Sequence, residues 1–212
     1  MITAQLLAAG SAHRFGAPKL VQELAGRAII RWVADALLAS RVDRLQVVVP
    51  PEHGDIVEAL AGTKASFVVN PYPEHGIGAS IAAGVSALGE RTDAVLIALA
   101  DEPGLDAAVV ASVLEAFRRS QATAAPCAIV APTYRGTPGH PVLFDRGVFA
   151  ELRALDGDRG ARSVIEREPS RVAIVQVDAP PPGDVDTPED LARLRRARQN
   201  MSGHSPFPTR DR

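Results

Sequence analysis

The sequence predicts an α/β protein with three layers, α/β/α, built around a Rossmann-like, mostly parallel sheet. Short apolar or β-branched runs alternate with stretches of helical periodicity along most of the 212 residues. The connections between them are short, which is typical of strand–helix–strand units with right-handed crossovers. Hydrophobic residues make up 46% of the chain and charged residues 23%. We therefore expect one globular domain over residues 1–200 and a flexible tail over residues 201–212.

The amino-terminal elements follow from this alternation. The apolar run at residues 2–8 predicts a buried strand, and the apolar periodicity at residues 26–40 predicts the helix after it. Trp32 lies in the apolar stripe of that helix, so we expect it in the core and not as a stacking platform. The β-branched run at residues 44–49, closed by two prolines, predicts a second parallel strand.

The same pattern continues through the middle of the chain. We expect a helix at residues 52–60 and a strand at residues 66–69. Residues 70–80 contain two prolines and two glycines, which predicts a long loop with a fixed path before a helix at residues 80–88. Six consecutive apolar residues, 94–99, predict a central strand that is buried on both faces.

The last third of the chain predicts further elements of both kinds. A flexible loop and a short strand are expected within residues 133–144, and a polar, glycine-containing turn within residues 156–162. The other expected elements are helices at residues 106–120, 161–168 and 188–199, and strands near residues 128–131 and at residues 172–177.

Charge and composition exclude several classes of protein. A formal net charge of −2 with both signs mixed argues against a general nucleic-acid partner, because such proteins usually carry a basic face. Cys127 is the single cysteine and cannot form an intrachain disulfide; we interpret it as a small buried residue, not as a nucleophile. There is no basic leader, and no apolar run approaches the ~20 residues needed to cross a bilayer. We expect a cytoplasmic protein with no membrane partner.

The loop within residues 6–20 is the first candidate site. Glycines 10 and 16 and the cations Arg14 and Lys19 follow directly on the first strand. Backbone N–H groups and cations at the carboxyl edge of a sheet can converge on an anion, which predicts a phosphate cradle. An ordinary strand–helix turn would explain the same residues. The spacing matches neither the G-x-G-x-x-G of dinucleotide folds nor a Walker loop.

Asp101 directly follows the predicted central strand. A carboxylate at that position needs hydrogen bonds, a cation or a metal ion, because its desolvation costs several kcal/mol. A metal site and a simple turn or helix cap both remain open.

A second acidic segment precedes the last predicted helix. Thr187 is the expected N-cap, with Pro188 in the first turn, and the acids that follow lie near the positive end of the helix dipole. This does not explain Asp184 and Asp186, whose side chains point the same way if the segment is extended.

Six motifs together resemble a known family. They are L-A-A-G-S-x-x-R-x-G-x-x-K-L from residue 7, N-P-x-x-x-x-G-x-x-x-S from residue 70, L-A-D-E-P from residue 99, G-H-P-V-L-F from residue 139, G-D-x-G-A-R from residue 157 and D-x-D-T-P-E-D-L from residue 184. The set resembles the MobA-like nucleotidyltransferases, which have a nucleotide-diphospho-sugar transferase, or glycosyltransferase-A-like, fold. Ala100 replaces the glycine usual before the aspartate. L-A-A-G and Gly-His-Pro favour the molybdenum cofactor cytidylyltransferase branch.

The resemblance implies a role for each matched residue. Asp101 and Asp186 would bind the catalytic metal ion, with Asp184 as a weaker candidate, and Arg14 and Lys19 would stabilise the triphosphate. His140 and Arg162 would lie on the acceptor side; a loop-holding histidine and a surface ion pair are the alternatives for these two. For Ser80, an N-cap role is equally compatible. The implied nucleotide-binding residues are Leu7, Ala8, Ala9, Gly10, Ser11, Arg14, Lys19, Gly76 and Ser80.

The implied reaction is the Mg²⁺-dependent transfer of CMP from CTP to molybdopterin cofactor with release of diphosphate. A molybdenum hydroxylase or its maturation factor would then be a partner. Three alternatives stay open: a guanylyltransferase of the same family, an NAD(P)H-dependent oxidoreductase acting on nitrogen heterocycles, and a non-catalytic nucleotide-binding maturation factor.

Overall fold

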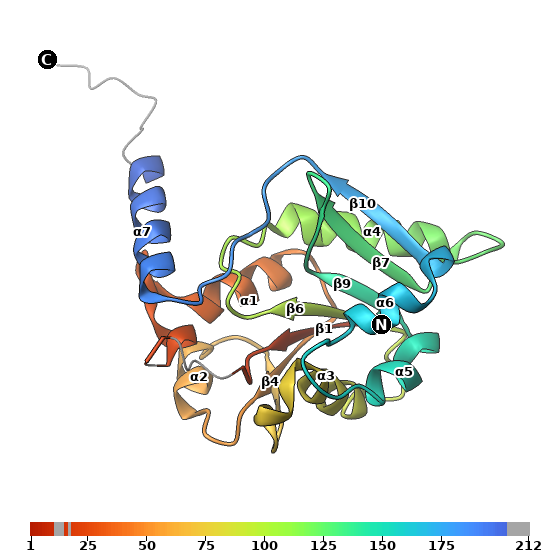
Figure 1. Cartoon of the computed structure of the whole chain (residues 1–212), viewed down its shortest axis with the longest axis horizontal. Helices are drawn as coiled ribbons and strands as arrows, with labels where there is room; N and C mark the ends of the chain where they lie inside the picture. Colours follow the sequence, from red (N-terminus) through yellow and green to blue (C-terminus); the bar gives the residue numbers. More distant parts are fainter. Residues whose placement is uncertain (11–14, 17, 203–212) are drawn as a thin grey trace, which may run out of the picture.

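The computed structural model describes residues 1–10, 15–16 and 18–202, and it is organised around one mixed sheet of eight strands (Figure 1). The strand order is β10-β7-β9-β6-β1-β4-β5, and β8 pairs with β7 at the side of this path. Along the path, β9 runs antiparallel to both of its neighbours, whereas the other pairs are parallel. The expected three-layer, mostly parallel architecture is confirmed. The strands are β1 (Ile2–Leu7), β4 (Arg44–Val49), β5 (Ser66–Val69), β6 (Ala94–Leu99), β7 (Ile129–Tyr134), β8 (Thr137–Pro138), β9 (Val142–Asp145) and β10 (Val172–Val177).

Helices cover both faces of this sheet (Figure 1). One face packs against apolar side chains of α1, α2 and α4, and the other packs against α3, α5 and α6. The α-helices are α1 (Ile29–Ala39), α2 (Gly54–Ala59), α3 (Gly76–Ser86), α4 (Ala107–Gln121), α5 (Phe149–Arg153), α6 (Arg162–Arg167) and α7 (Pro188–Ser202). Short 3₁₀ helices are η1 (Lys19–Val21), η2 (Pro73–His75), η3 (Arg146–Val148) and η4 (Pro169–Arg171). In the described part of the chain, no helix is long and apolar enough to traverse a bilayer.

A small hairpin precedes α1, and the sequence prediction of one helix from residue 26 is wrong there. Strands β2 (Glu23–Leu24) and β3 (Arg27–Ala28) pair antiparallel across Ala25 and Gly26, which have φ of 51° and 79°. Two successive left-handed residues are typical of the tight turns that match the twist of a hairpin. Strands of two residues are too short to produce a periodic pattern.

Helix α7 packs beside this hairpin, and its contacts with Trp32 differ from those expected of a core residue. Val185 and Leu191 form a small apolar cluster with Leu24 and Ile29, and Trp32 packs against it only partly buried. The Trp32 indole N–H donates to the Leu24 carbonyl (2.8 Å), and the Arg198 guanidinium lies 3.7 Å from the ring centre. The indole therefore supports a cation–π contact with α7, which the prediction of a core tryptophan missed. Cys127 is likewise only half-buried.

The predicted start of α3 is also wrong by four residues. The helix begins at Gly76 and not near Ser80, because glycines 76 and 78 allow a neighbouring loop to approach. A Cβ atom at Gly78 would lie 2.7 to 2.9 Å from backbone atoms of Asp156. The Gly78 N–H donates to the Gly157 carbonyl, and the Gly157 N–H donates to the His75 carbonyl, both at 2.9 Å. Tertiary contact thus overrides the poor helix propensity of glycine here.

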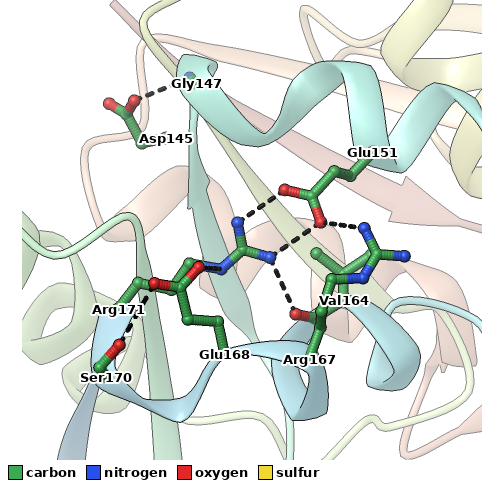
Figure 2. Close-up of polar contacts among 8 residues, drawn as sticks. All are labelled: Asp145, Gly147, Glu151, Val164, Arg167, Glu168, Ser170 and Arg171. Carbon is green, nitrogen blue, oxygen red and sulfur yellow. Dashed lines mark hydrogen bonds and ion pairs between the residues drawn. The ribbon is translucent and has the colours of Figure 1, made fainter.

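An ion-pair network joins α5, α6 and the start of β10 (Figure 2). Arg171 donates to both oxygens of the Glu151 carboxylate (2.6 and 2.8 Å) and to the Val164 carbonyl (3.1 Å). Arg167 donates to the same carboxylate at 2.8 Å. The hydrogen bond from Arg171, together with the charges of both arginines, lowers the pKa of Glu151 against the opposing effect of burial.

Candidate active site

The carboxyl ends of β1 and β6 define the place where a site can form. The two strands pair in parallel up to Leu7 and Leu99, and the Ala100 N–H donates to the Leu7 carbonyl at 3.1 Å. The direction in which successive strands are added to the sheet changes at β1. β4 and then β5 lie on one side of β1, and β6 lies on the other side. Ligands of open α/β sheets bind in the crevice beyond such a switch point.

Lys19 brings the two predicted metal ligands together at this edge. Its Nζ lies 2.7 Å from an oxygen of Asp101 and 3.0 Å from an oxygen of Asp186. The side chains of Lys19, Asp101 and Asp186 are 11%, 23% and 42% exposed. Burial lowers the pKa of Lys19, but hydrogen bonds and charges from both carboxylates outweigh this effect and raise it above 10.5. The ammonium group is charged at neutral pH.

Short-range contacts fix where Asp186 lies. The neighbouring Val185 is fully buried, and its N–H donates to the Asp101 carbonyl at 2.9 Å. On the other side, Thr187 and Asp190 cap α7 reciprocally: the Asp190 carboxylate accepts from the Thr187 N–H (2.9 Å), and the Asp190 N–H donates to the Thr187 hydroxyl (3.2 Å). Asp184 is exposed.

A cavity of about 470 Å³ opens beside Asp101. Its walls come from the end of β1, the end of β6, η2 with the first turns of α3, and the turn after Gly157. The lining residues are Leu7, Gly10, Pro73, Glu74, Gly76, Ile77, Ser80, Leu99, Asp101 and Asp158. Four predicted nucleotide-binding residues, Leu7, Gly10, Gly76 and Ser80, thus share one cavity.

The other predicted nucleotide-binding residues differ in position. Ala8 and Ala9 are buried in the two sides of the core. Ser11 and Arg14 lie outside the described residues. Glu74 and Asp158 line the cavity although the sequence interpretation did not select them. For Asp158, the signal was the polar turn at residues 156–162, which the resemblance had assigned to the acceptor side.

Ser80 lies inside α3, so the alternative of an N-cap is wrong. Its hydroxyl is buried and accepts a hydrogen bond from the Asn70 amide at 3.0 Å. The Asn70 carbonyl oxygen in turn accepts from the Tyr72 N–H, also at 3.0 Å. These contacts hold the Ser80 side chain at the cavity wall.

The two residues predicted for the acceptor side lie in different surroundings. The His140 imidazole Nδ1 is 3.5 Å from a carboxylate oxygen of Glu102, next to Asp101, and the Tyr134 hydroxyl donates to the His140 carbonyl at 2.6 Å. Burial, followed by the charges of Glu102 and Asp106, raises the pKa of Tyr134 to about 12, so it remains a donor. Arg162 is 80% exposed and pairs with Glu166 at 2.7 Å.

The converging carboxylates suit a hard divalent cation. Residues 1–10, 15–16 and 18–202 contain no group of three or more His, Cys, Asp or Glu side chains that could hold a metal ion. Mg²⁺ is commonly bound by only one or two carboxylates, with water and substrate phosphates completing its octahedron. Asp101 and Asp186 therefore fit a metal ion that is shared with a nucleotide.

A mixed, mostly parallel sheet with a cavity and two converging acids beyond its switch point fits a nucleotidyltransferase of the nucleotide-diphospho-sugar transferase fold. The chain belongs to the MobA-like NTP transferase family, whose domain description matches residues 4–174. The family implies a nucleoside triphosphate substrate.

Three relatives match about nine-tenths of the chain. The nicotine blue oxidoreductase of Paenarthrobacter nicotinovorans is 30% identical over 91% of this chain and 96% of its own length. The purine catabolism protein PucB of Bacillus subtilis is 31% identical over 90% and 94%. A probable molybdenum cofactor guanylyltransferase of Natronomonas pharaonis is 30% identical over 91% and 96%.

Solved structures agree with this assignment. The Mycobacterium sp. strain JC1 homologue of Mycobacterium tuberculosis Rv0371c superimposes with a TM-score of 0.82 at 26% identity, covering 94% of this chain and 98% of that one. Rv0371c itself in complex with manganese gives 0.75 at 25% identity, covering 92% and 98%. A structural relative has therefore been solved with a divalent metal ion.

Proposed function

We propose that this protein transfers CMP from CTP to a molybdopterin-type acceptor. The observation that carries the proposal is the convergence of Asp101 and Asp186 around Lys19, beside a cavity lined by residues of the first loop and α3. In the reaction, an acceptor phosphate oxygen attacks the α-phosphorus of CTP. A new P–O bond forms, the bond to the bridging oxygen breaks, and diphosphate leaves with that electron pair.

The proposed roles follow from position and charge, except that of Arg14, which rests on the resemblance alone. Asp101 and Asp186 would hold a divalent cation, for which we propose Mg²⁺; when bound, the cation would neutralise charge on the phosphates. Lys19 and Arg14 would bind the triphosphate and stabilise the charge that develops on the leaving diphosphate. Gly76 and Ser80 would contact the nucleoside.

The acceptor would bind on the side of Asp101 that faces away from the cavity. His140, which lies beside Glu102, would contact the acceptor, and Arg162 would have to leave Glu166 to bind an acceptor phosphate. No nucleophilic side chain is needed, because the acceptor supplies the attacking oxygen. A molybdenum hydroxylase, or a factor that matures one, would receive the product.

The direct test is diphosphate release with each of the four nucleoside triphosphates, Mg²⁺ or Mn²⁺, and molybdopterin cofactor. We expect turnover to depend on the acceptor and to be fastest with CTP. Preference for GTP would assign the protein to the guanylyltransferase branch instead. Binding of CTP with no turnover would support a non-catalytic maturation role.

A redox function is the second candidate, because one relative of 30% identity is an oxidoreductase. The test is the oxidation of NADH or NADPH, followed by absorbance, in the presence of a reducible nitrogen-heterocyclic chromophore. Turnover in this assay, without diphosphate release in the first one, would replace the proposed transferase activity.

A further inference from the structure

We propose that Lys19 is a built-in counter-ion for the metal site, which holds Asp101 and Asp186 together and opposes binding of a divalent cation to the same oxygens until it withdraws. The inference rests on the proposed function only for the metal-binding role of these two acids. It assigns to Lys19 a second task besides contact with the triphosphate.

The two cations compete for the same carboxylate oxygens. The Lys19 ammonium already lies 2.7 and 3.0 Å from one oxygen of each acid. Mg²⁺ requires carboxylate oxygens at about 2.1 Å. A metal ion bound to the same two oxygens would therefore lie less than about 5 Å from the ammonium nitrogen. The two charges would also repel each other strongly at that separation.

The surrounding structure keeps Lys19 in this position. Lys19 begins η1, and the next two residues, Leu20 and Val21, pack against the main core. Its side chain is only 11% exposed, so it does not extend into solvent. Asp186 is tied to the Asp101 loop through Val185. Without a cation between them, the two carboxylates would repel each other across this contact.

A nucleoside triphosphate provides the means of release. Its phosphates are strong acceptors for an ammonium group and also supply oxygen ligands for the metal. Movement of Lys19 from the carboxylates to the phosphates would remove its charge from both acids at the moment when the metal arrives with the nucleotide. Metal and nucleotide should therefore bind with positive coupling, and metal alone should bind weakly.

The first test measures binding of Mn²⁺ alone, by electron paramagnetic resonance of the free ion, to the wild-type protein and to Lys19→Met. We expect Lys19→Met to bind Mn²⁺ at least about tenfold more tightly, since a unit and a double charge ~4 Å apart repel by more than this factor even in water. Lys64→Met is the matched control, because Lys64 is exposed and its loss changes the net charge equally. Equal or weaker binding by Lys19→Met, or binding by neither protein, would overturn the inference.

A second measurement needs no substitution at Lys19. Lys19 and Lys64 are the two lysines of the chain, so protein labelled with ¹³C-lysine gives two side-chain Cε signals. Titration with Mg²⁺ should shift the Lys19 signal and leave the Lys64 signal in place, and Asp101→Asn should abolish the shift. Bound Mg²⁺ that leaves the Lys19 signal unchanged would contradict the displacement of Lys19.

These experiments contain neither nucleotide nor acceptor. Absence of CMP transfer in the activity assay would thus refute the proposed function without changing the metal-binding result. Conversely, unchanged Mn²⁺ affinity in Lys19→Met would refute the counter-ion and leave CMP transfer to be judged separately.

Discussion

Single glycines decide how closely the segments around Asp101 approach each other. Gly104 follows the Asp101 turn, and a Cβ atom built there would overlap the carbonyl oxygen of Pro182. Pro182 belongs to the segment that leads to Asp186. Because glycine has only a hydrogen atom in place of a side chain, position 104 allows the close spacing between the two acidic segments.

Gly104→Ala should push the Pro182 segment away and carry Asp186 from Asp101. We expect a loss of about 1–3 kcal/mol in the free energy of unfolding, which is typical of overpacking, together with a lower kcat for nucleotidyl transfer. Urea unfolding and steady-state kinetics would measure both. Gly89→Ala is the control, because a Cβ atom at Gly89 meets no heavy atom within 4 Å and the residue has no positive φ.

At the scale of elements, α7 depends on its first turn. Thr187 and Asp190 satisfy each other's backbone N–H groups at the helix start, and the same turn positions Asp186. Removal of an N-cap hydroxyl typically costs ~0.5–2 kcal/mol.

Thr187→Ala should therefore lower the free energy of unfolding within that range and weaken binding of the triphosphate with its metal, while Thr187→Ser should retain most of both. Denaturant titration and calorimetric measurement of CTP binding would check this. If Thr187→Ala and Thr187→Ser lowered stability and CTP binding equally, the methyl group of Thr187, and not its N-cap hydrogen bond, would be responsible.

The Glu151 network is the second element-scale test, because it joins α5 to α6 and β10 (Figure 2). Glu151→Gln should lower the free energy of unfolding at pH 7 by about 1–3 kcal/mol, since it weakens charge-assisted hydrogen bonds from Arg171 and Arg167. Glu115→Gln is the matched control. Glu115 forms an exposed pair with Arg119, and such pairs contribute little.

The pH dependence of this effect has a definite sign. The pKa of Glu151 is lower in the folded protein than in the unfolded chain, where it is about 4.3. Its contribution is fully present above the unfolded pKa and is lost as the pH falls through the folded pKa. The difference between wild type and Glu151→Gln should be constant from pH 7 to about pH 5 and shrink below pH 4. A difference that grows on acidification would contradict this assignment.

At the scale of the whole molecule, one sheet carries both the cavity beside Asp101 and the residues proposed for the acceptor side. Strands β1 and β6 end at the cavity, and β9 joins β6 to β7 and β10. Ligands that bind only the folded protein should stabilise the sheet as a unit.

Mn²⁺ and CTP together should raise the Tm of the wild-type protein by several degrees at 100 times their Kd, because binding then adds about 2.7 kcal/mol. Asp101→Asn should lose most of this increase. Asp106→Asn is the control, because asparagine can replace Asp106 as N-cap of α4. Differential scanning fluorimetry would measure the shifts, and an equal rise in both variants would exclude Asp101 from the metal site.

The sequence was most informative about the bounds of several strands. The predicted bounds of β4, β5, β6 and β10 match the structure, because continuous apolar or β-branched runs leave little ambiguity. Asp101 could be recognised as a residue in need of a partner for the same reason, since it lies two residues after the end of β6. The expectation of one domain over residues 1–200 stays a prediction.

Features that depend on contacts between distant segments were not predictable. The early start of α3 needs the loop at residues 156–158, and the entry of Asp158 into the cavity has the same cause. The bridging position of Lys19 depends on three segments that meet only in the folded protein. The local sequence pattern contains no information about which distant segments come into contact.

The central position of β1 has a consequence for biosynthesis. This strand is made long before β6, but Ile2 pairs with Ala94 and Leu7 with Leu99, so one of its edges has no partner until residues 94–99 have been translated. Its backbone groups are exposed to aggregation or to chaperones during that interval. We expect ribosome-bound nascent chains that end before residue 94 to be cut readily by protease, and those that expose residues beyond 99 to begin to resist it.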